Sequence, residues 1–513
     1  MLTLITSWRR WLGPVLLVIV AFGFRSAHYS ENYGHPDETI TVEVVGHMRS
    51  SGDWDSNWAK ANLEPGFRYE QYNFASYLHA TFGFYRLVKV IPALDEWRSR
   101  DGGFWVYRFF SVLLATLAVV QTWWLGRRIG GARVGLAAGV LAAVLPGLVQ
   151  DAHYARPEAF VTVLTLAAVM LSLPRETFSP WRVFGAAVII GVAVACKISM
   201  LALAWLPLVA LLPVEGGTAA GRRRWAGAVG LTLTGLIVGF AAGAPDAVAH
   251  LEIYARGVLY LTQHYAGLHP PHSPMVDKTA AGLLTGYYVS TLGWLGLAAG
   301  LGGAMALGWQ RRGREWVALV GPVVLFVGYF CTRSVFFERN LSHVLPLACV
   351  LMAVGLAAGA SWIGRRCGVR AAWCLAGLLA LALVRPTDIS MRLIQVFSGE
   401  PAKERAVQRE RLRLAHPDLV WRETDLLSNL ALDEMKQHFK DAGGALLVRV
   451  IDYHDEWSAY HAPLFQAQFE AKLLATAPSV FGDVGSCTLH TYGSWTDRFY
   501  LVKGVLKDAG AGK

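Results

Sequence analysis

Residues 104–158 read FWVYRFFSVLLATLAVVQTWWLGRRIGGARVGLAAGVLAAVLPGLVQDAHYARPE. Two apolar runs, 104–125 and 132–149, flank a basic turn, and a charged loop follows the second run. Each run approaches the length of roughly 20 residues that an α-helix needs to cross a bilayer. The stretch therefore predicts a membrane hairpin with its arginines on one side and the loop 150–156 on the other.

The same pattern extends along the chain from residue 11 to residue 385. It predicts a polytopic α-helical membrane protein with about eleven transmembrane helices, each near the expected length. The apolar segments are 11–27, 104–125, 132–149, 157–173, 181–197, 199–213, 226–244, 284–308, 316–332, 341–361 and 371–385.

Basic clusters test the orientation of these segments, because cytoplasmic loops carry an excess of Lys and Arg. Every cluster falls in an alternate loop, so a cytoplasmic N-terminus places all of them on the cytoplasmic side. The clusters are Arg9-Arg10, Arg127-Arg128 with Arg133, Arg175 with Arg182, Arg222-Arg223-Arg224, Arg311-Arg312 with Arg314, and Arg365-Arg366 with Arg370.

Composition agrees with a membrane protein and argues against other classes. Of 513 residues, 54% are hydrophobic and 16% are charged, with a mean hydropathy of +0.37; soluble proteins carry about 25% charged residues. The net charge of +10 does not indicate nucleic-acid binding, because no continuous basic face is present. Six cysteines without a CxxC pair predict neither a disulfide framework nor a zinc site.

The two ends of the chain are interpreted separately. Residues 1–28 predict an uncleaved first helix, because no small-residue cleavage site follows the apolar run, and Arg25 is expected to snorkel at its outer end. The tail 386–513 is charged and long enough for its own core. It predicts an α/β domain on the outer side, with helices at 401–415 and 462–476 and strands at 445–451, 487–491 and 498–503.

The tetrapeptide His35-Pro36-Asp37-Glu38 places two adjacent carboxylates in the long outer loop 28–103. Residues 37–49 predict a helix, so these carboxylates can simply complement its dipole. Ionisable groups at a membrane boundary and unusually long loops are, however, often functional. Asp37 and Glu38 are therefore predicted as catalytic residues. On the outer face, a lipid-borne substrate is more accessible than a cytosolic nucleotide.

Three cations and one further carboxylate are expected on the same side. Lys197 interrupts an apolar stretch, where an unpaired lysine costs about 2.5–3.5 kcal/mol on insertion scales. It either snorkels or binds the phosphate of a lipid carrier. Arg156 carries a permanent charge that suits a phosphate, whereas Glu158 also suits a helix start. Arg339 is either an interfacial anchor or a second phosphate ligand.

Four short stretches occur in order on the outer side: HPDE at 35–38, YEQYNFASYL at 69–78, HYARPE at 153–158 and FERNL at 337–341. Together they resemble the GT-C glycosyltransferases, in particular family 39, which includes protein O-mannosyltransferases and the lipid A aminoarabinose transferase. The resemblance implies a GT-C membrane domain at 1–385 with its catalytic loop at 28–103, followed by the periplasmic domain 386–513.

The resemblance also implies an activity. A hexose or pentose passes with inversion from a polyprenyl-phosphate donor to a hydroxyl of an acceptor protein, lipid or glycan, at the outer face of a bacterial inner membrane. Asp37 acts as general base, and Glu38 or Glu158 orients the acceptor. Arg339 and Arg156 of the matching stretches, together with Lys197, are expected to bind the lipid phosphate. Other residues of these stretches are expected to orient sugar and acceptor (His35, His153, Tyr154 and Tyr72).

Two other function classes stay open at this point. A transporter also carries charges, but usually near the bilayer midplane and in repeated halves, whereas here the charges gather on one side. A lipid-linked ligase, or an inactive relative that binds glycan or lipid, shares the same features. The sequence compels no cofactor, and dependence on a divalent metal stays open. Several residues could act as ligands to a divalent metal ion, but their spacing matches no firm metal signature. They are Asp37, Glu38 and the loop histidines His264, His269 and His272.

Overall fold

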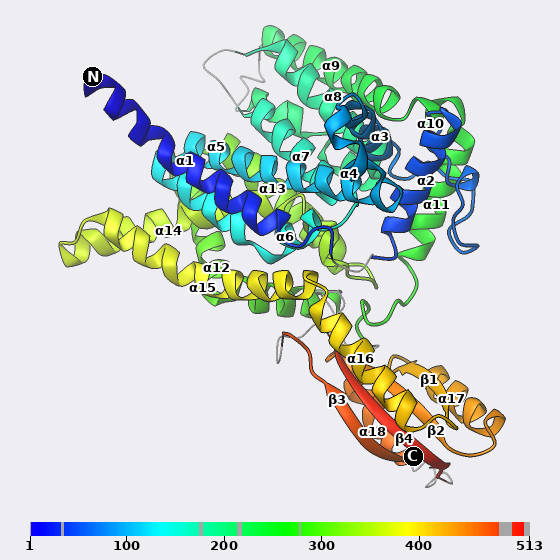
Figure 1. Cartoon of the computed structure of the whole chain (residues 1–513). Helices are drawn as coiled ribbons and strands as arrows, with labels where there is room; N and C mark the ends of the chain where they lie inside the picture. Colours follow the sequence, from blue (N-terminus) through cyan, green and yellow to red (C-terminus); the bar gives the residue numbers. More distant parts are fainter. Residues whose placement is uncertain are drawn as a thin grey trace.

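The computed structural model describes residues 2–31, 35–173, 178–212, 218–275, 279–481 and 495–506, with side chains from residue 11 onward. A large helical body carries a small sheet domain that follows its last long helix (Figure 1). The α-helices of the body are α1 (Leu2–Ser26), α2 (Glu38–Ser51), α3 (Ala75–Lys89), α4 (Asp95–Ser99), α5 (Phe104–Val144), α6 (Pro146–Ala152), α7 (Glu158–Ser172), α8 (Pro180–Cys196), α9 (Ala219–Gly243), α10 (Pro245–Ala249), α11 (Leu251–His264), α12 (Ala280–Trp309), α13 (Gly313–Cys331), α14 (Leu345–Cys367) and α15 (Ala371–Phe397).

Short 3₁₀ turns connect several of these helices. They are η1 (Trp58–Lys60), η2 (Pro92–Leu94), η3 (Arg100–Gly103), η4 (Ile198–Leu203), η5 (Leu206–Leu211) and η6 (Glu338–Leu341). The predicted segment 199–213 is thus a pair of 3₁₀ turns. The predicted helix at 37–49 is confirmed by α2.

Six helical stretches of the described chain are long and apolar enough to cross a membrane. They contain α5, α9, α12, α13, α14 and α15. Four shorter apolar stretches add Trp11–Ser26, Glu158–Ser172, Pro180–Cys196 and Ile198–Leu211. With α5 counted as two spans, these stretches coincide with the apolar segments predicted from the sequence. The polytopic helical fold class is confirmed.

The bend in α5 is set by Gly131, whose φ of 82° and ψ of −176° are not helical. A Cβ added to Gly135 would lie 2.7 Å from the carbonyl oxygen of Trp123. In a straight helix, residues twelve positions apart are about 18 Å apart. The chain therefore reverses at Gly131, and α5 is the hairpin that the basic turn predicted.

Arg25 differs from its predicted role. Its side chain is fully buried and donates hydrogen bonds to the carbonyl oxygens of Ala21 at 3.1 Å, Ala142 at 2.9 Å and Ala143 at 2.9 Å. The last carbonyls of a helix have no partner within the helix. Arg25 does not snorkel, because it satisfies these groups at the end of α5.

The C-terminal domain is built on a four-stranded sheet in the order β1-β2-β4-β3. Strands β1 and β2 are parallel, and the other pairs are antiparallel. Buried side chains of β2, α17, α18 and β4 form its core. Its elements are α16 (Glu400–Ala415), β1 (Val420–Asp425), α17 (Asn429–Asp441), β2 (Leu446–Asp452), α18 (Glu456–Gln468), β3 (Phe469–Ala477) and β4 (Thr496–Val505).

This domain confirms the predicted α/β character but corrects one element. The expected helix 462–476 ends at Gln468, and the rest of it is strand β3. The sequence FEAKLLATA is rich in helix formers, but pairing with β4 overrides that local preference. The predicted strand 487–491 lies outside the described residues. Helix α15 runs without a break across residue 386 into Phe397, and the domain division at 386 stays a prediction.

Candidate active site

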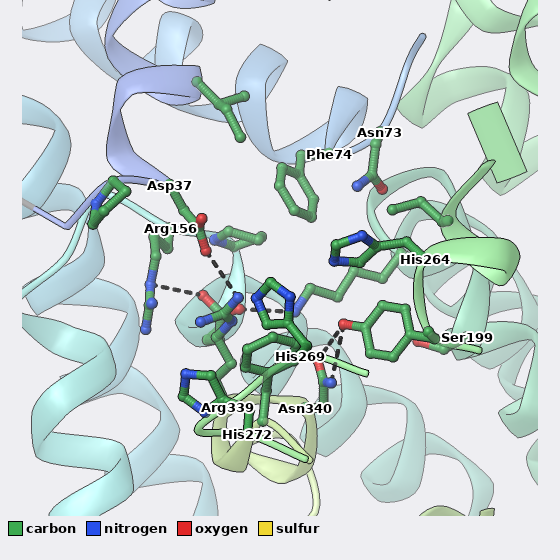
Figure 2. Close-up of a pocket in the computed structure, with 18 of the residues that line it drawn as sticks. Asp37, Asn73, Phe74, Arg156, Ser199, His264, His269, His272, Arg339 and Asn340 are labelled. Atoms are coloured by element: carbon green, nitrogen blue, oxygen red, sulfur yellow. Dashed lines mark hydrogen bonds and ion pairs between the residues drawn. The ribbon is translucent and has the colours of Figure 1, made fainter. Parts of the chain in front are cut away.

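A cavity of about 620 Å³ lies among the ends of several helices and the loops that join them. Its walls come from the start of α2, the loop before α3, the loop before α7, the segment after α8, the end of α11 with the loop that follows it, the end of α13, η6, and two residues of the C-terminal domain. Figure 2 shows that Asp37, Arg156, Arg339, His264 and His269 surround the same space.

Asp37 lies at the N-cap position of α2, and its side chain is 29% exposed. Its Oδ2 atom is 3.0 Å from Nη2 of Arg339, which is 18% exposed. The Asp37 backbone N–H donates to Nδ1 of His35 at 3.1 Å. Pro36 precedes this turn, and its fixed φ suits the approach to a helix. The result is a partly exposed carboxylate held beside one cation.

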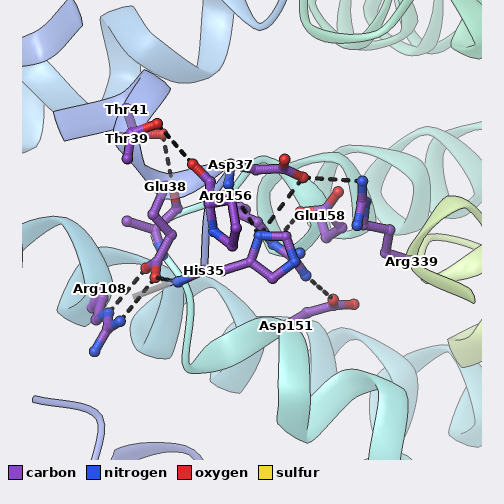
Figure 3. A network of polar contacts seen from close by, with 12 residues as sticks. His35, Asp37, Glu38, Thr39, Thr41, Arg108, Asp151, Arg156, Glu158 and Arg339 are labelled. Carbon is purple, nitrogen blue, oxygen red and sulfur yellow. Dashed lines mark hydrogen bonds and ion pairs between the residues drawn. The ribbon is translucent and has the colours of Figure 1, made fainter. Parts of the chain in front are cut away.

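Glu38 is adjacent in sequence but lies elsewhere (Figure 3). Its carboxylate accepts hydrogen bonds from Arg108 Nε at 2.9 Å, from Arg108 Nη2 at 2.8 Å and from the Ala155 backbone N–H at 2.6 Å. Both side chains of this pair are at most 2% exposed, and neither lines the cavity. Successive helix residues point about 100° apart. This placement argues against a direct catalytic role for Glu38.

Lys197 directly follows α8 and reaches the cavity. Its Nζ atom is 2.8 Å from Oε1 of Glu158, and the lysine is 18% exposed whereas the glutamate is 3% exposed. The ring of Phe74 lies 5.9 Å from Nζ. The buried carboxylate therefore fixes the lysine while leaving part of its ammonium group open to the cavity.

Arg156 is more enclosed than the other two cations. It lies 3.4 Å from Asp151 and 3.5 Å from Glu158, and its guanidinium covers the ring of Tyr154 at 4.8 Å. Its side chain lines the cavity but is only 2% exposed. Because two carboxylates already balance its charge, Arg156 mainly organises the loop before α7. Arg339 and Lys197 are the cations that remain accessible.

The residues predicted to orient sugar and acceptor divide into two groups. His35 and Tyr154 line the cavity, with ring centroids 5.3 Å apart. His153 does not line it: its ring nitrogens bond the carbonyl oxygens of Val149 and Ala27, both at 2.8 Å. Tyr72 is buried and lines a separate, much smaller pocket. The second group is therefore not positioned to touch a ligand in the main cavity.

Several lining residues were not predicted as site residues. His264 and His269, expected to be ordinary loop histidines, face the cavity with ring centroids 5.2 Å apart. Burial lowers the pKa of His269, and His264 and Arg339 act in the same direction. Asn340 donates to the Tyr265 hydroxyl at 3.1 Å. No local sequence signal separates these residues from other loop residues.

A buried carboxylate lies next to Arg339. Glu338 is 6% exposed, and burial raises its pKa to about 7, although Arg339 opposes this shift. Within the described residues, no group of three His, Cys, Asp or Glu side chains is arranged to hold a metal ion. The Asp37 carboxylate lies beside the Arg339 cation, and Nδ1 of His35 is 3.8 Å from the same carboxylate oxygen.

Comparison with known proteins places this geometry in a wider context. Residues 100–245 match the family model described as dolichyl-phosphate-mannose-protein mannosyltransferase. The matched part includes Arg156, Glu158 and Lys197. A search of curated proteins found no match.

Solved structures resemble almost the whole chain. ArnT from Cupriavidus metallidurans in the apo state matches with a TM-score of 0.52 and 14% identity, covering 99% of each chain. The same protein bound to undecaprenyl phosphate gives 0.50 and 14%, covering 97% of this chain and 99% of that one. The chain has the GT-C glycosyltransferase fold. This confirms the fold that the resemblance of the four short stretches implied.

A third GT-C structure is more distant. The Archaeoglobus fulgidus oligosaccharyltransferase tethered to an acceptor peptide gives a TM-score of 0.52 and 12% identity, covering 91% of this chain and 72% of that chain. At these identities the likeness concerns the fold. What the site does must be argued from the side chains of this chain.

Proposed function

We propose that this protein transfers a sugar from a polyprenyl-phosphate donor to an acceptor hydroxyl, with inversion, at the outer face of a bacterial inner membrane. The observation that carries the proposal is the partly exposed Asp37 carboxylate, which lies 3.0 Å from Arg339 in a cavity that also exposes Lys197. A carboxylate beside two accessible cations combines a proton acceptor with a binding site for a phosphate.

The reaction uses these groups in one displacement. Asp37 removes the proton from the acceptor hydroxyl, and the oxygen attacks the anomeric carbon of the donor sugar. The bond between that carbon and the phosphate oxygen breaks, and the polyprenyl phosphate leaves with the bonding electrons. Attack from the side opposite the leaving group inverts the anomeric carbon. The products are the glycosylated acceptor, which carries the sugar, and the free polyprenyl phosphate.

The cations stabilise the charge that develops on the leaving phosphate. Arg339 and Lys197 are both 18% exposed, so each can turn part of its charge toward a ligand. Charges that are already fixed in place need little reorganisation during the reaction, and such preorganisation is usually a large part of catalysis. Glu158 acts through Lys197 by holding its ammonium group, rather than by touching the acceptor.

The comparisons support a lipid donor of this kind. One of the similar structures is described as bound to undecaprenyl phosphate, and the matching family model is named for a dolichyl-phosphate sugar. The six basic clusters in alternate loops support a cytoplasmic N-terminus. The cavity and the C-terminal domain then face the periplasm.

The first experiment identifies the bound lipid. The wild-type protein, extracted gently, is compared by mass spectrometry with Lys197→Ala, Arg339→Ala and the control Arg256→Ala, whose side chain is 66% exposed on α11. We expect a polyprenyl phosphate or its glycosylated form in the wild type and in the control, and its loss from the two cavity variants. A wild type without such a lipid in repeated extractions contradicts the donor and favours a transporter or a binding protein.

A second measurement addresses the base. Asp37→Asn should keep the glycosylated lipid, because both cations remain, but should not transfer its sugar. The matched control is Asp53→Asn in the same outer loop, whose carboxylate is 50% exposed. Transfer at the wild-type rate by Asp37→Asn removes this residue from the mechanism.

A further inference from the structure

Two aromatic side chains of the C-terminal domain, Tyr453 and Trp495, line the same cavity as Asp37. Their ring centroids are 5.8 Å apart, and the ring planes are inclined by 56°. They lie at the same end of the sheet, because Tyr453 follows β2 and Trp495 precedes β4, and these strand ends pair through Asp452 and Thr496. We propose that Tyr453 and Trp495 bind a sugar ring of a saccharide acceptor. This inference rests on the proposed transfer reaction and names its acceptor class.

The loop that carries Tyr453 is tightly fixed. The next residue, His454, has a backbone φ of 55°, which residues other than glycine rarely adopt. Its backbone N–H donates to Asp452 at 2.9 Å, and its Nε2 atom bonds the Thr496 hydroxyl at 2.7 Å. A strained residue persists where the surroundings hold it, and such residues cluster at ligand-binding sites. The loop therefore presents Tyr453 in a set position.

Trp495 is held from the opposite side by a buried charge network. Arg405 of α16 donates to the Trp495 carbonyl oxygen at 3.1 Å and lies 3.2 Å from Asp497. The Asp497 carboxylate is fully buried and also accepts two hydrogen bonds of 3.0 Å from Arg449. Helix α16 follows α15 after a single turn (Figure 1). These contacts within the C-terminal domain fix the backbone that carries the Trp495 ring.

The same domain also holds a wall of the cavity that belongs to the membrane body. The Trp457 indole N–H donates to the Ser273 carbonyl oxygen at 2.6 Å, and Glu456 accepts a hydrogen bond from the Met275 backbone N–H. The Ser273 hydroxyl in turn accepts a hydrogen bond from the His269 backbone N–H at 2.7 Å. Since His269 lines the cavity, the C-terminal domain shapes the cavity in two places.

The chemistry of these contributions favours an uncharged, ring-shaped ligand. Among the described residues, the C-terminal domain gives the cavity two aromatic side chains and no charged one. Such rings bury apolar surface and keep one polar atom each for hydrogen bonding. They match the apolar face and the hydroxyl edge of a pyranose and do not compete with the cations for phosphate. The cavity of about 620 Å³ lies within the usual range of about 300–1,000 Å³ for small-ligand sites.

A polypeptide acceptor fits this part of the wall less well. Extended peptides are commonly bound by adding a strand to an exposed sheet edge. The edge strands of the described sheet are β1 and β3, and neither contributes a residue to the cavity. This wall presents the faces of two aromatic rings, whereas an extended peptide needs backbone hydrogen-bond partners.

Saturation-transfer NMR on the full protein in nanodiscs tests this inference, because maltoside detergents carry sugar headgroups of their own. The probes are methyl glucoside, methyl galactoside and methyl mannoside, and a serine- and threonine-containing decapeptide. We expect saturation of pyranose ring protons in the wild type. The affinity should fall about tenfold, as for loss of a stacked aromatic contact, in Tyr453→Ala and in Trp495→Ala. Tyr453→Phe keeps the ring and should retain binding within a fewfold. Tyr453→Leu, which removes the ring but keeps apolar volume, replaces the alanine variant if that fails to fold, with the same expected loss.

The control is Tyr460→Ala, an exposed tyrosine of α18 outside the cavity. Equal saturation of all pyranosides in the wild type and in both alanine variants overturns the inference, and so does binding of the decapeptide alone. Lipid analysis of the same samples separates this failure from failure of the proposed function. A wild type that carries the polyprenyl lipid but binds no pyranoside contradicts the acceptor class only.

Discussion

Replacing Glu38 with glutamine separates the two adjacent carboxylates, because only Asp37 faces the cavity. Glu38 accepts two hydrogen bonds from Arg108 and one each from the backbone N–H groups of Ala155 and His35. An amide is neutral and has a single acceptor oxygen, so it cannot balance the guanidinium. We expect Glu38→Gln to lower stability, whereas Asp37→Asn should leave it nearly unchanged and abolish transfer.

The magnitude follows from burial. The Arg108 side chain is 0% exposed and that of Glu38 is 2% exposed, and removing one partner of such a pair costs about 3–5 kcal/mol. Glutamine keeps the volume and one hydrogen bond, so the lower end, about 3 kcal/mol, applies. With about 2 °C per kcal/mol for larger chains, the unfolding midpoint should fall by about 6 °C. The part-exposed pair of Asp37 and Arg339 contributes about 1 kcal/mol or less.

Tryptophan fluorescence during heating measures these midpoints in one detergent at a fixed lipid content. Arg108→Met provides the partner variant, and the double variant with Glu38→Gln should melt higher than the sum of the two single losses predicts, because both buried charges are then absent. A wild-type midpoint for Glu38→Gln combined with lost transfer would contradict the structural assignment and return Glu38 to the reaction. Strict additivity of the two variants would refute their pairing.

Two further predictions use the same unfolding measurement. Gly131→Ala should lower the free energy of unfolding by about 1–3 kcal/mol, because its backbone conformation is nearly exclusive to glycine. No neighbouring atom blocks the new methyl group, so the cost comes from the backbone alone. The control Gly227→Ala, in an open helical position, should be neutral or mildly stabilising. Glu338, whose pKa rises from 4.5 to about 7 in the folded protein, binds its proton more tightly when folded. Its stabilising contribution is therefore full below pH 4.5 and is lost as the pH rises through about 7. Glu338→Gln should flatten this part of the profile, and an unchanged slope between pH 5 and 7 would contradict the assignment.

The membrane fold was predictable because its signal is local and repeated. Each span shows as an apolar run, and the Arg127-Arg128 turn marks the hairpin that closes at Gly131. Physical context limited the rest. Arg25 lies at the end of an apolar run, as a snorkelling residue would, but it is buried because it bonds the carbonyl oxygens of Ala142 and Ala143 at the end of α5. Strand β3 has helix-forming residues, and only its distant partner β4 decides its conformation.

The candidate site was predictable in part for a related reason. Charged residues at the ends of apolar runs stand out, so Asp37, Lys197 and Arg339 could be found one at a time. The partners of these residues could not be predicted. The sequence pairs Glu38 with Asp37, whereas in the structure Glu38 bonds Arg108, seventy positions away. His264 and His269 carry no mark that separates cavity from loop. The spacing of residues along the chain predicts which side chains share one face of a helix. It does not predict which distant segment packs against that face.

The cavity therefore does not follow the division of the chain into a membrane part and a soluble part. Helix α15 passes uninterrupted from one part to the next, and Tyr453 and Trp495 enter the cavity from beyond it. The Trp457 contact with Ser273 fixes the loop of His269 from outside the membrane body. Removal of the C-terminal domain would take away the wall formed by Tyr453 and Trp495. It would also release the loop of His269 from its contact with Trp457. Transfer should then depend on the whole chain, even though the proton acceptor and both accessible cations lie before residue 340.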